Sequence, residues 1–163
     1  MTDLDQPLAA IEAAYRLNYP KFLHVATAVT GDAELGADAV QEAFVRAIVR
    51  RHTFRGAGPV EAWLWRIVVN AARDVVASRR PVPVPELPED LQPSGAAGDG
   101  SHVRAAVAAL PERQRLVLFL RYFADLDYET IGLTLAITPG TVGATLNSTH
   151  AALRARIEEV QIG

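Results

Sequence analysis

The sequence predicts an all-α protein made of two small helical domains that are joined by a linker rich in proline and glycine. Apolar residues recur at helical spacing in both halves of the chain, and no stretch alternates as a β-strand does. Between the halves, residues 81–101 begin with five prolines in 13 residues and end in Ser, Gly and Ala. Because proline lacks an amide donor and disfavours helix in the residue before it, we expect a linker there.

These boundaries predict a first domain over residues 1–80 and a second over 102–163. The 163 residues are 50% hydrophobic and 21% charged, a composition that allows a buried core. No apolar run approaches the roughly 20 residues that span a bilayer, and the acidic N-terminus does not resemble a secretory signal. We therefore expect a cytoplasmic protein without membrane insertion. The absence of cysteine excludes disulfides and thiolate metal sites.

Four helical segments are expected in the first domain. The first covers about residues 8–17, and a second ends at the Thr30-Gly31-Asp32 break. The third follows this break and continues to about Arg51. After a glycine-containing loop, the fourth covers about Val60–Arg79, with Pro59 suited to its first turn.

The second domain is expected to hold helices over about 103–109, 111–122, 128–136 and 139–160, with Asp127 and Thr138 as caps of the last two. A short helix, a tight break and a second capped helix form the layout of a helix-turn-helix. On layout alone, DNA binding and an ordinary pair of packed helices are equally favoured.

The charge of the chain is unevenly distributed. The net charge is −3, yet residues 43–80 hold eight arginines against two acids. On the helix after the glycine loop, Arg66, Asn70 and Arg73 share one face, with Trp63 at its margin. Asparagine is a poor residue for a helix interior, so its place between two arginines needs an explanation, and a contact with nucleic acid is one, although this pattern alone favours a solvated helix face.

An amphipathic segment precedes this basic block. Asp38, Gln41, Glu42 and Arg46 lie on the side of a helix opposite to its apolar residues. By itself, this pattern indicates only an amphipathic helix.

Taken in order, these segments resemble the extracytoplasmic-function (ECF) group of bacterial RNA polymerase sigma factors, within the sigma-70 family. The matching strings are DAVQEAFVRAI at 38–48, FRGAGPVEAWLWRIVVN at 54–70, LPERQRLVLFLRY at 110–122 and LDYETIGLTLAITPGTV at 126–142. Four strings in this order, divided by a proline-rich linker, make the resemblance specific.

The resemblance implies a sigma factor that directs core RNA polymerase to promoters and melts the −10 element, with no enzymatic activity, cofactor or metal of its own. Implied partners are the clamp and flap regions of core polymerase, promoter DNA and an anti-sigma factor. The implied polymerase contacts are Asp38, Gln41, Glu42, Phe44 and Arg46. The implied −10 contacts are Phe54, Arg55, Gly56, Trp63, Arg66, Asn70 and Arg73. The implied −35 contacts are Thr138, Thr141, Thr145, Asn147 and Thr149.

The helix expected to recognise the −35 element departs from the family pattern, because residues 130–153 contain no Lys, Arg, Asp or Glu. Much of a protein's affinity for DNA comes from cations that face phosphates. Two alternatives therefore stay open: a degenerate sigma-like protein whose last helix binds another protein, and a free-standing helix-turn-helix regulator. Enzymes are disfavoured, because the four histidines lack metal-ligand spacing and no nucleophile–base pair is present.

Overall fold

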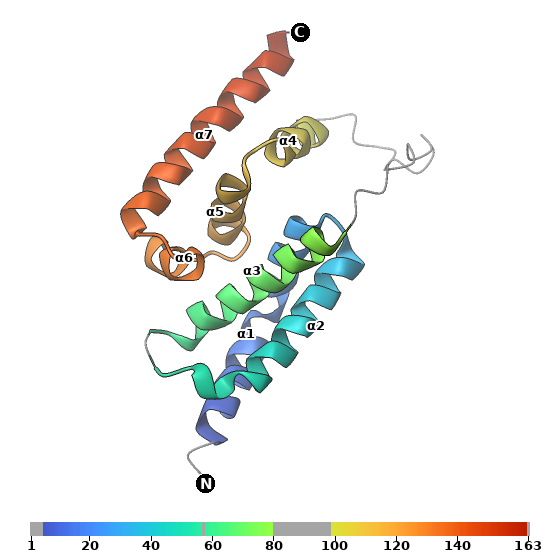
Figure 1. Cartoon of the computed structure of the whole chain (residues 1–163). Coiled ribbons are helices and arrows are strands. Elements are labelled where there is room, and N and C mark those ends of the chain that lie inside the picture. The colour runs from blue at the N-terminus through green and yellow to red at the C-terminus, as the bar shows by residue number, and fades with distance from the viewer. Residues whose placement is uncertain (1–4, 57, 80–98, 163) are drawn as a thin grey trace.

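The computed structural model describes residues 5–56, 58–79 and 99–162 (Figure 1). Every regular element in these ranges is helical: α1 (Asp5–Thr30), α2 (Ala33–Val49), the 3-10 turn η1 (Arg51–Thr53), α3 (Val60–Ser78), α4 (Asp99–Ala108), α5 (Glu112–Tyr122), α6 (Tyr128–Leu135) and α7 (Pro139–Ile162). The all-α prediction is confirmed. The predicted linker lies mostly outside the described residues, but residues 99–101 belong to α4 and not to the linker.

Helices α1, α2 and α3 form a bundle around large apolar side chains. Phe22 of α1 and Trp65 of α3 are fully buried, and their rings meet edge to face with centroids 4.6 Å apart. Such an aromatic pair adds about 0.5–1.5 kcal/mol beyond the burial of its area. Because Trp65 points into the bundle, the opposite side of α3 faces outward.

The structure corrects one predicted boundary in α1, which is a single helix rather than two. Pro20 lies inside it, where proline removes a backbone hydrogen bond at a cost of about 3 kcal/mol. Ile11 and Phe22, on either side of Pro20, are both fully buried in the bundle. Their burial offsets the cost of the proline, and this tertiary effect is not visible in the local sequence.

Side-chain oxygens cap three helices, and the caps predicted at Asp127 and Thr138 are present. The backbone amides of Leu35, Thr130 and Thr141 donate to Asp32, Asp127 and Thr138 over 3.0, 2.8 and 3.1 Å. Hydrogen bonds from Thr130 lower the pKa of the Asp127 carboxyl below its usual value. Pro59 directly precedes α3, at the cap rather than in the first turn.

The second domain ends in the predicted arrangement of α6, a tight turn and α7. Ala136, the residue that ends α6, has a left-handed backbone with φ 57°. Gly132 allows the chain to turn closely over α6, because a Cβ there would lie 2.6 Å from the carbonyl oxygen of Ile137. Val142 and Leu146 of α7 are buried against this unit. The turn therefore presents the N-terminal half of α7 at the surface.

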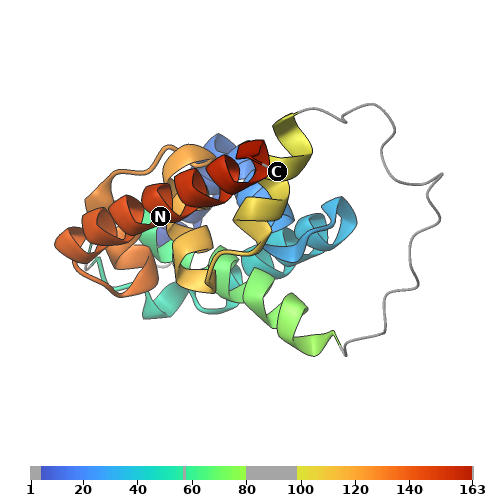
Figure 2. The ribbon, with the colours of Figure 1, turned by 90° about the horizontal axis from the view of Figure 1, so that it is seen from above.

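The two domains pack against each other along α3. Figures 1 and 2 show the second domain beside the three-helix bundle, with α6 against α3 and α5 against α1. One cluster of buried apolar side chains includes residues of both domains. Helix α2 packs on α1 and α3, on the side of the bundle away from α6 (Figure 1).

Gly36 lies where α2 crosses α1, and we predict that Gly36→Ala destabilises the chain. A Cβ at this position would lie 2.7 Å from the backbone nitrogen and 2.8 Å from the Cα of Thr27. We expect a loss of about 1–3 kcal/mol in the free energy of unfolding, measured by thermal denaturation.

The matched control is Gly100→Ala in α4, where nothing lies within 4 Å of the added Cβ. Helix propensity alone predicts that this control is stabilised by up to about 1 kcal/mol. Equal melting temperatures for the two variants would contradict the close crossing of α1 and α2.

Candidate nucleic-acid and polymerase interfaces

The amphipathic helix identified in the sequence is α2, and its predicted contact residues divide into two groups. Asp38, Gln41 and Glu42 are exposed. Phe44 instead turns inward and packs on Tyr15, with ring centroids 4.1 Å apart. Burial, followed by the charge on Tyr19, raises the pKa of the Tyr15 hydroxyl. Phe44 therefore contributes to the bundle, and the first three residues remain available to a partner.

Arg46 connects α2 to α3. Its Nη1 donates to Asp74 Oδ2 over 2.8 Å, and its Nε donates to Glu42 Oε1 over 3.1 Å. The hydrogen bond to Asp74, supported by Glu42, raises the pKa of the guanidinium above its ordinary value. The Arg46 side chain is 28% exposed, and its contact with Asp74 connects α2 to α3.

Two valines extend the exposed face of α2, and sequence reasoning missed them. The side chains of Val45 and Val49 are 52% and 63% exposed. At 100° per residue, they lie within about 100° of Asp38, Gln41 and Glu42. Their spacing, off the buried stripe of Ala39, Ala43 and Ala47, was the available signal. The resulting polar and apolar surface (Asp38, Gln41, Glu42, Val45 and Val49) is called the docking face below.

An aromatic pair connects the loop before α3 to the first turns of α3. Phe54 and Trp63 are half-buried, and their ring centroids lie 5.5 Å apart. Arg55 and Gly56 are exposed beside them, and Gly56 has a positive φ of 72°. The loop and the start of α3 therefore bring four of the predicted −10 residues together, and aromatic faces of this kind can stack on unpaired bases.

The other three predicted −10 residues lie on the outward side of α3, where they face the second domain. Arg66 Nη2 donates to the backbone oxygen of Leu133 over 2.8 Å, and Arg73 Nε lies 2.6 Å from Glu112 Oε1. Asn70 is exposed and lines a hollow of about 360 Å³ together with Arg73 and Glu112. The structure thus collects two cations and an amide on one helix face.

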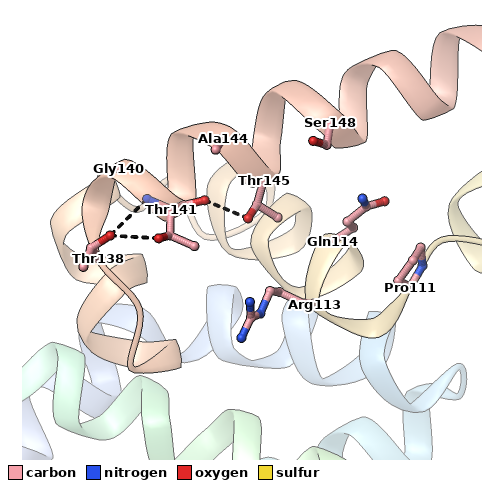
Figure 3. A pocket seen from close by; sticks show the side chains of 9 residues that line it. All are labelled: Pro111, Arg113, Gln114, Thr138, Gly140, Thr141, Ala144, Thr145 and Ser148. Carbon is pink, nitrogen blue, oxygen red and sulfur yellow. Dashed lines mark hydrogen bonds between the residues drawn. The ribbon is translucent and has the colours of Figure 1, made fainter.

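The predicted −35 residues of α7 have different environments. Thr138 and Thr141 share a hydrogen bond between their hydroxyls, and the hydroxyl of Thr145 donates to the Thr141 oxygen over 2.7 Å (Figure 3). Asn147 is exposed. Thr149 is fully buried, and its hydroxyl donates to the backbone oxygen of Thr145 over 2.7 Å. Its predicted DNA contact is therefore not supported, because the side chain faces the core.

Two residues of α5 lie beside this part of α7 and were not predicted. Arg113 and Gln114, with Pro111, line an open hollow of about 570 Å³ whose other wall is formed by α7 (Figure 3). Its α7 residues are Thr138, Gly140, Thr141, Ala144, Thr145 and Ser148. Arg113 and Gln114 are far from α7 in sequence, so only the fold indicates that a cation and an amide border the neutral helix.

Within the described ranges, no group of three or more His, Asp or Glu side chains is placed to hold a metal ion. None of the helices in these same ranges is long and apolar enough to cross a bilayer.

The sequence matches two family models, Sigma-70 region 2 over residues 14–81 and Sigma-70, region 4 over residues 102–147. It is 30% identical over 144 residues to the RNA polymerase sigma-H factor of Pseudomonas aeruginosa, which covers 75% of this chain and 72% of that protein. The chain belongs to the sigma-70 family. The ECF RNA polymerase sigma factor SigE of Mycolicibacterium smegmatis is 29% identical over 154 residues, covering 88% of this sigma factor and 56% of SigE.

A solved structure supports the fold of this sigma factor. The sigma factor RpoE of Bartonella quintana, in complex with the anti-sigma factor NepR, superposes with a TM-score of 0.62 at 19% identity and covers 90% of this chain and 96% of that one. This likeness shows the fold, and the family and sequence matches above identify an ECF sigma factor that directs promoter-specific transcription. The two alternative functions are not favoured.

We predict that Arg46 is a structural residue of the first domain. Arg46→Gln removes the connection from α2 to Asp74 and should lower the stability of this domain by about 0.5–1 kcal/mol, the range for a partly exposed ion pair. Both tryptophans, Trp63 and Trp65, lie in α3, so tryptophan fluorescence during urea unfolding reports on the first domain.

Arg16→Gln is the control, because Arg16 pairs with Glu12 within the single helix α1. We expect a smaller shift of the urea midpoint for this variant. A midpoint for Arg46→Gln equal to that of Arg16→Gln would show that the connection between helices contributes nothing.

Proposed function

We propose that three surfaces divide the work of this sigma factor. The docking face of α2 binds core RNA polymerase, the loop and outward side of α3 recognise and melt the −10 element, and α7 with the start of α5 contacts the −35 element. The observation that carries this proposal is the outward side of α3. There, Arg66, Asn70 and Arg73 share a helix with Trp63, whose ring packs on Phe54 of the preceding loop.

The docking face suits a protein partner. It combines exposed carboxylate and amide groups with two exposed valines, a mixture of polar and apolar groups that is common at protein interfaces. It lies on the helix that packs away from α6, so the second domain does not cover it (Figure 1). We infer that core polymerase binds here. Because a sigma factor acts together with polymerase, we also infer that this chain is cytoplasmic and that the polymerase, not this chain, carries out the chemistry.

Removing the polar part of the docking face should weaken binding to core polymerase. We expect the double variant Asp38→Ala/Gln41→Ala to lose about 1–2 kcal/mol of binding free energy, a typical cost for a few interface side chains. The measurement is a titration of labelled sigma factor with purified core polymerase. The circular dichroism spectrum of the double variant should match that of the parent, because both replaced side chains are exposed.

The control for this titration is Glu158→Ala/Gln161→Ala, which removes the same two groups from the exposed end of α7. It should bind core polymerase as the parent does. If both double variants bind equally well, the docking face has been assigned to the wrong surface.

The −10 surface combines two kinds of contact. The arginines of α3 can hold phosphates, which fixes the register of a strand but carries no sequence information. Asn70 can donate and accept hydrogen bonds at a base edge, and Phe54 with Trp63 can stack on a base that leaves the duplex. We infer that Asn70 contributes to base preference, and that Arg66 and Arg73 contribute affinity.

Substitutions of α3 should separate these roles in the polymerase holoenzyme. Asn70→Ala should change base preference at one promoter position by about 1–3 kcal/mol, whereas Arg66→Ala should weaken all sequences alike and reduce the salt dependence. The assay is open-complex footprinting on promoters with permuted −10 sequences. A uniform loss for Asn70→Ala would reduce it to a structural residue, and a sequence-specific loss for Arg66→Ala would reverse the two roles.

The −35 surface is proposed to use hydroxyl and amide groups in place of a charged helix. Thr145 and Ser148 line the hollow that Arg113 and Gln114 border, and Asn147 is exposed on another part of α7. A surface with one neighbouring cation releases few counterions, so its own affinity for DNA is weak. Attachment to polymerase offsets this weakness by raising the effective concentration of the domain beside the promoter.

We therefore expect Arg113 to contribute to DNA binding, although it lies outside α7. Arg113→Ala should weaken holoenzyme binding to promoters that depend on a −35 element and reduce the salt slope by about one. Thr145→Arg should tighten binding by adding a phosphate contact. Arg154→Ala, which lies further along α7, is the control and should behave as the parent in filter binding across a salt series. If Arg113→Ala and Arg154→Ala give identical slopes, α5 takes no part in DNA binding.

An anti-sigma factor is a further partner that we propose. The structural neighbour RpoE is bound to an anti-sigma factor, and this chain shares its fold over 90% of its length. The proposal for this chain rests on that shared fold.

A further inference from the structure

One face of α7 carries only small side chains, and it lines the hollow of about 570 Å³ between α7 and the start of α5 (Figure 3). At 100° per residue, the residues of this face lie within about 100° of one another; they are Thr141, Ala144, Thr145 and Ser148. All four side chains end at or before the γ position, so a base edge can approach the helix closely.

The hydroxyl of Thr145 has already donated its only proton within the helix. It donates to the backbone oxygen of Thr141, one turn earlier, over 2.7 Å. A threonine hydroxyl has one proton to donate and two lone pairs that accept. Guanine presents only the acceptors N7 and O6 to the major groove, so Thr145 offers no donor to guanine while this bond is in place. Thr145 can still accept a hydrogen bond or contact a base through its methyl group.

The same hydrogen bond fixes the direction of the Thr145 methyl group. The hydroxyl oxygen and the methyl carbon are both attached to Cβ, so holding one of them sets the position of the other. Figure 3 shows the methyl carbon turned away from the bond to Thr141. Ala144 adds an exposed methyl group to the same face. A side chain that is already held in one rotamer loses little conformational entropy when it binds.

Thymine is the base that presents an apolar group to the major groove, its C5 methyl, and threonine and alanine methyl groups are suited to contact it. We propose that this face of α7 recognises a thymine of the −35 element through the methyl group of Thr145, which makes Thr145 a specificity-determining residue. This inference rests on the proposed contact between α7 and the −35 element. Arg113 then supplies affinity through a phosphate, and Thr145 supplies base preference.

Replacing thymine by deoxyuridine tests this contact, because deoxyuridine lacks only the C5 methyl and keeps the hydrogen bonds of the base pair. Promoter fragments that the holoenzyme retains from a genomic library supply the −35 sequence, and each thymine on either strand is replaced in turn. In a filter-binding titration of the holoenzyme, we expect one replacement to weaken binding about fourfold, the effect of losing one buried methyl group. Thymines of the spacer between the two elements, replaced in the same way, are the control and should change nothing.

Two substitutions of Thr145 separate its methyl group from its hydroxyl. Thr145→Ser removes the methyl and keeps the hydroxyl, so this variant should bind thymine and deoxyuridine equally at the sensitive position. Thr145→Val keeps a methyl and removes the hydroxyl, so it should retain the roughly fourfold preference for thymine. The reverse pattern would assign the preference to the hydroxyl and overturn the proposal.

Equal affinity for thymine and deoxyuridine at every −35 position would also overturn it, and this comparison uses the parent protein, so it does not depend on the folding of a variant. A −35 element made only of G·C pairs, or a preference that is unchanged in Thr145→Ser, has the same consequence. The −35 role of α7 is judged separately by DNase I footprinting of the holoenzyme. Protection of the −35 region without a thymine preference contradicts only the methyl contact, whereas an unprotected −35 region contradicts the proposed function and the methyl contact with it.

Discussion

The burial of Trp65 against Phe22 orients α3, and the arrangement of the other surfaces follows from that orientation. With Trp65, Leu64 and Val68 in the core, the residues on the opposite side of the helix must face outward. Those residues are two arginines and an asparagine, groups that are costly to bury without partners. The same packing places α2 on the far side of α3 from the second domain. One buried contact therefore separates the surface that we propose for nucleic acid from the docking face that we propose for polymerase.

An exposed row of cations needs hydrogen-bond acceptors, and two sets of acceptors suit it. One is the promoter strand, whose phosphates and base edges suit arginine and asparagine. The other is the second domain, which supplies the end of α6 and the carboxylate of Glu112. In the structure, Arg66 and Arg73 contact the second set. For the neutral surface of α7, we propose DNA binding that depends on attachment to polymerase.

Local patterns in the sequence predicted most of the fold and part of the site. Apolar spacing, the caps at Asp127 and Thr138 and the break at Gly31 are local signals, and the helices begin and end close to them. The continuity of α1 through Pro20 was missed, because it depends on burial on both sides of the proline. Thr149 was assigned to DNA but is buried, and Phe44 and Arg46, assigned to polymerase, also contact the bundle, since helical periodicity gives the angle of a residue and not what packs there. Arg113 and Gln114 were missed because tertiary packing alone brings them to α7.

The central claim is that this chain, once bound to core polymerase, opens promoter DNA through α3. The most direct measurement is permanganate footprinting of a genomic fragment library, using core polymerase from a bacterium that encodes this chain, followed by sequencing of the reactive thymines. We expect clusters of unpaired thymines at a shared −10 motif when chain and core polymerase are present together, and none with either alone. A pattern that is identical with and without the chain would contradict the account.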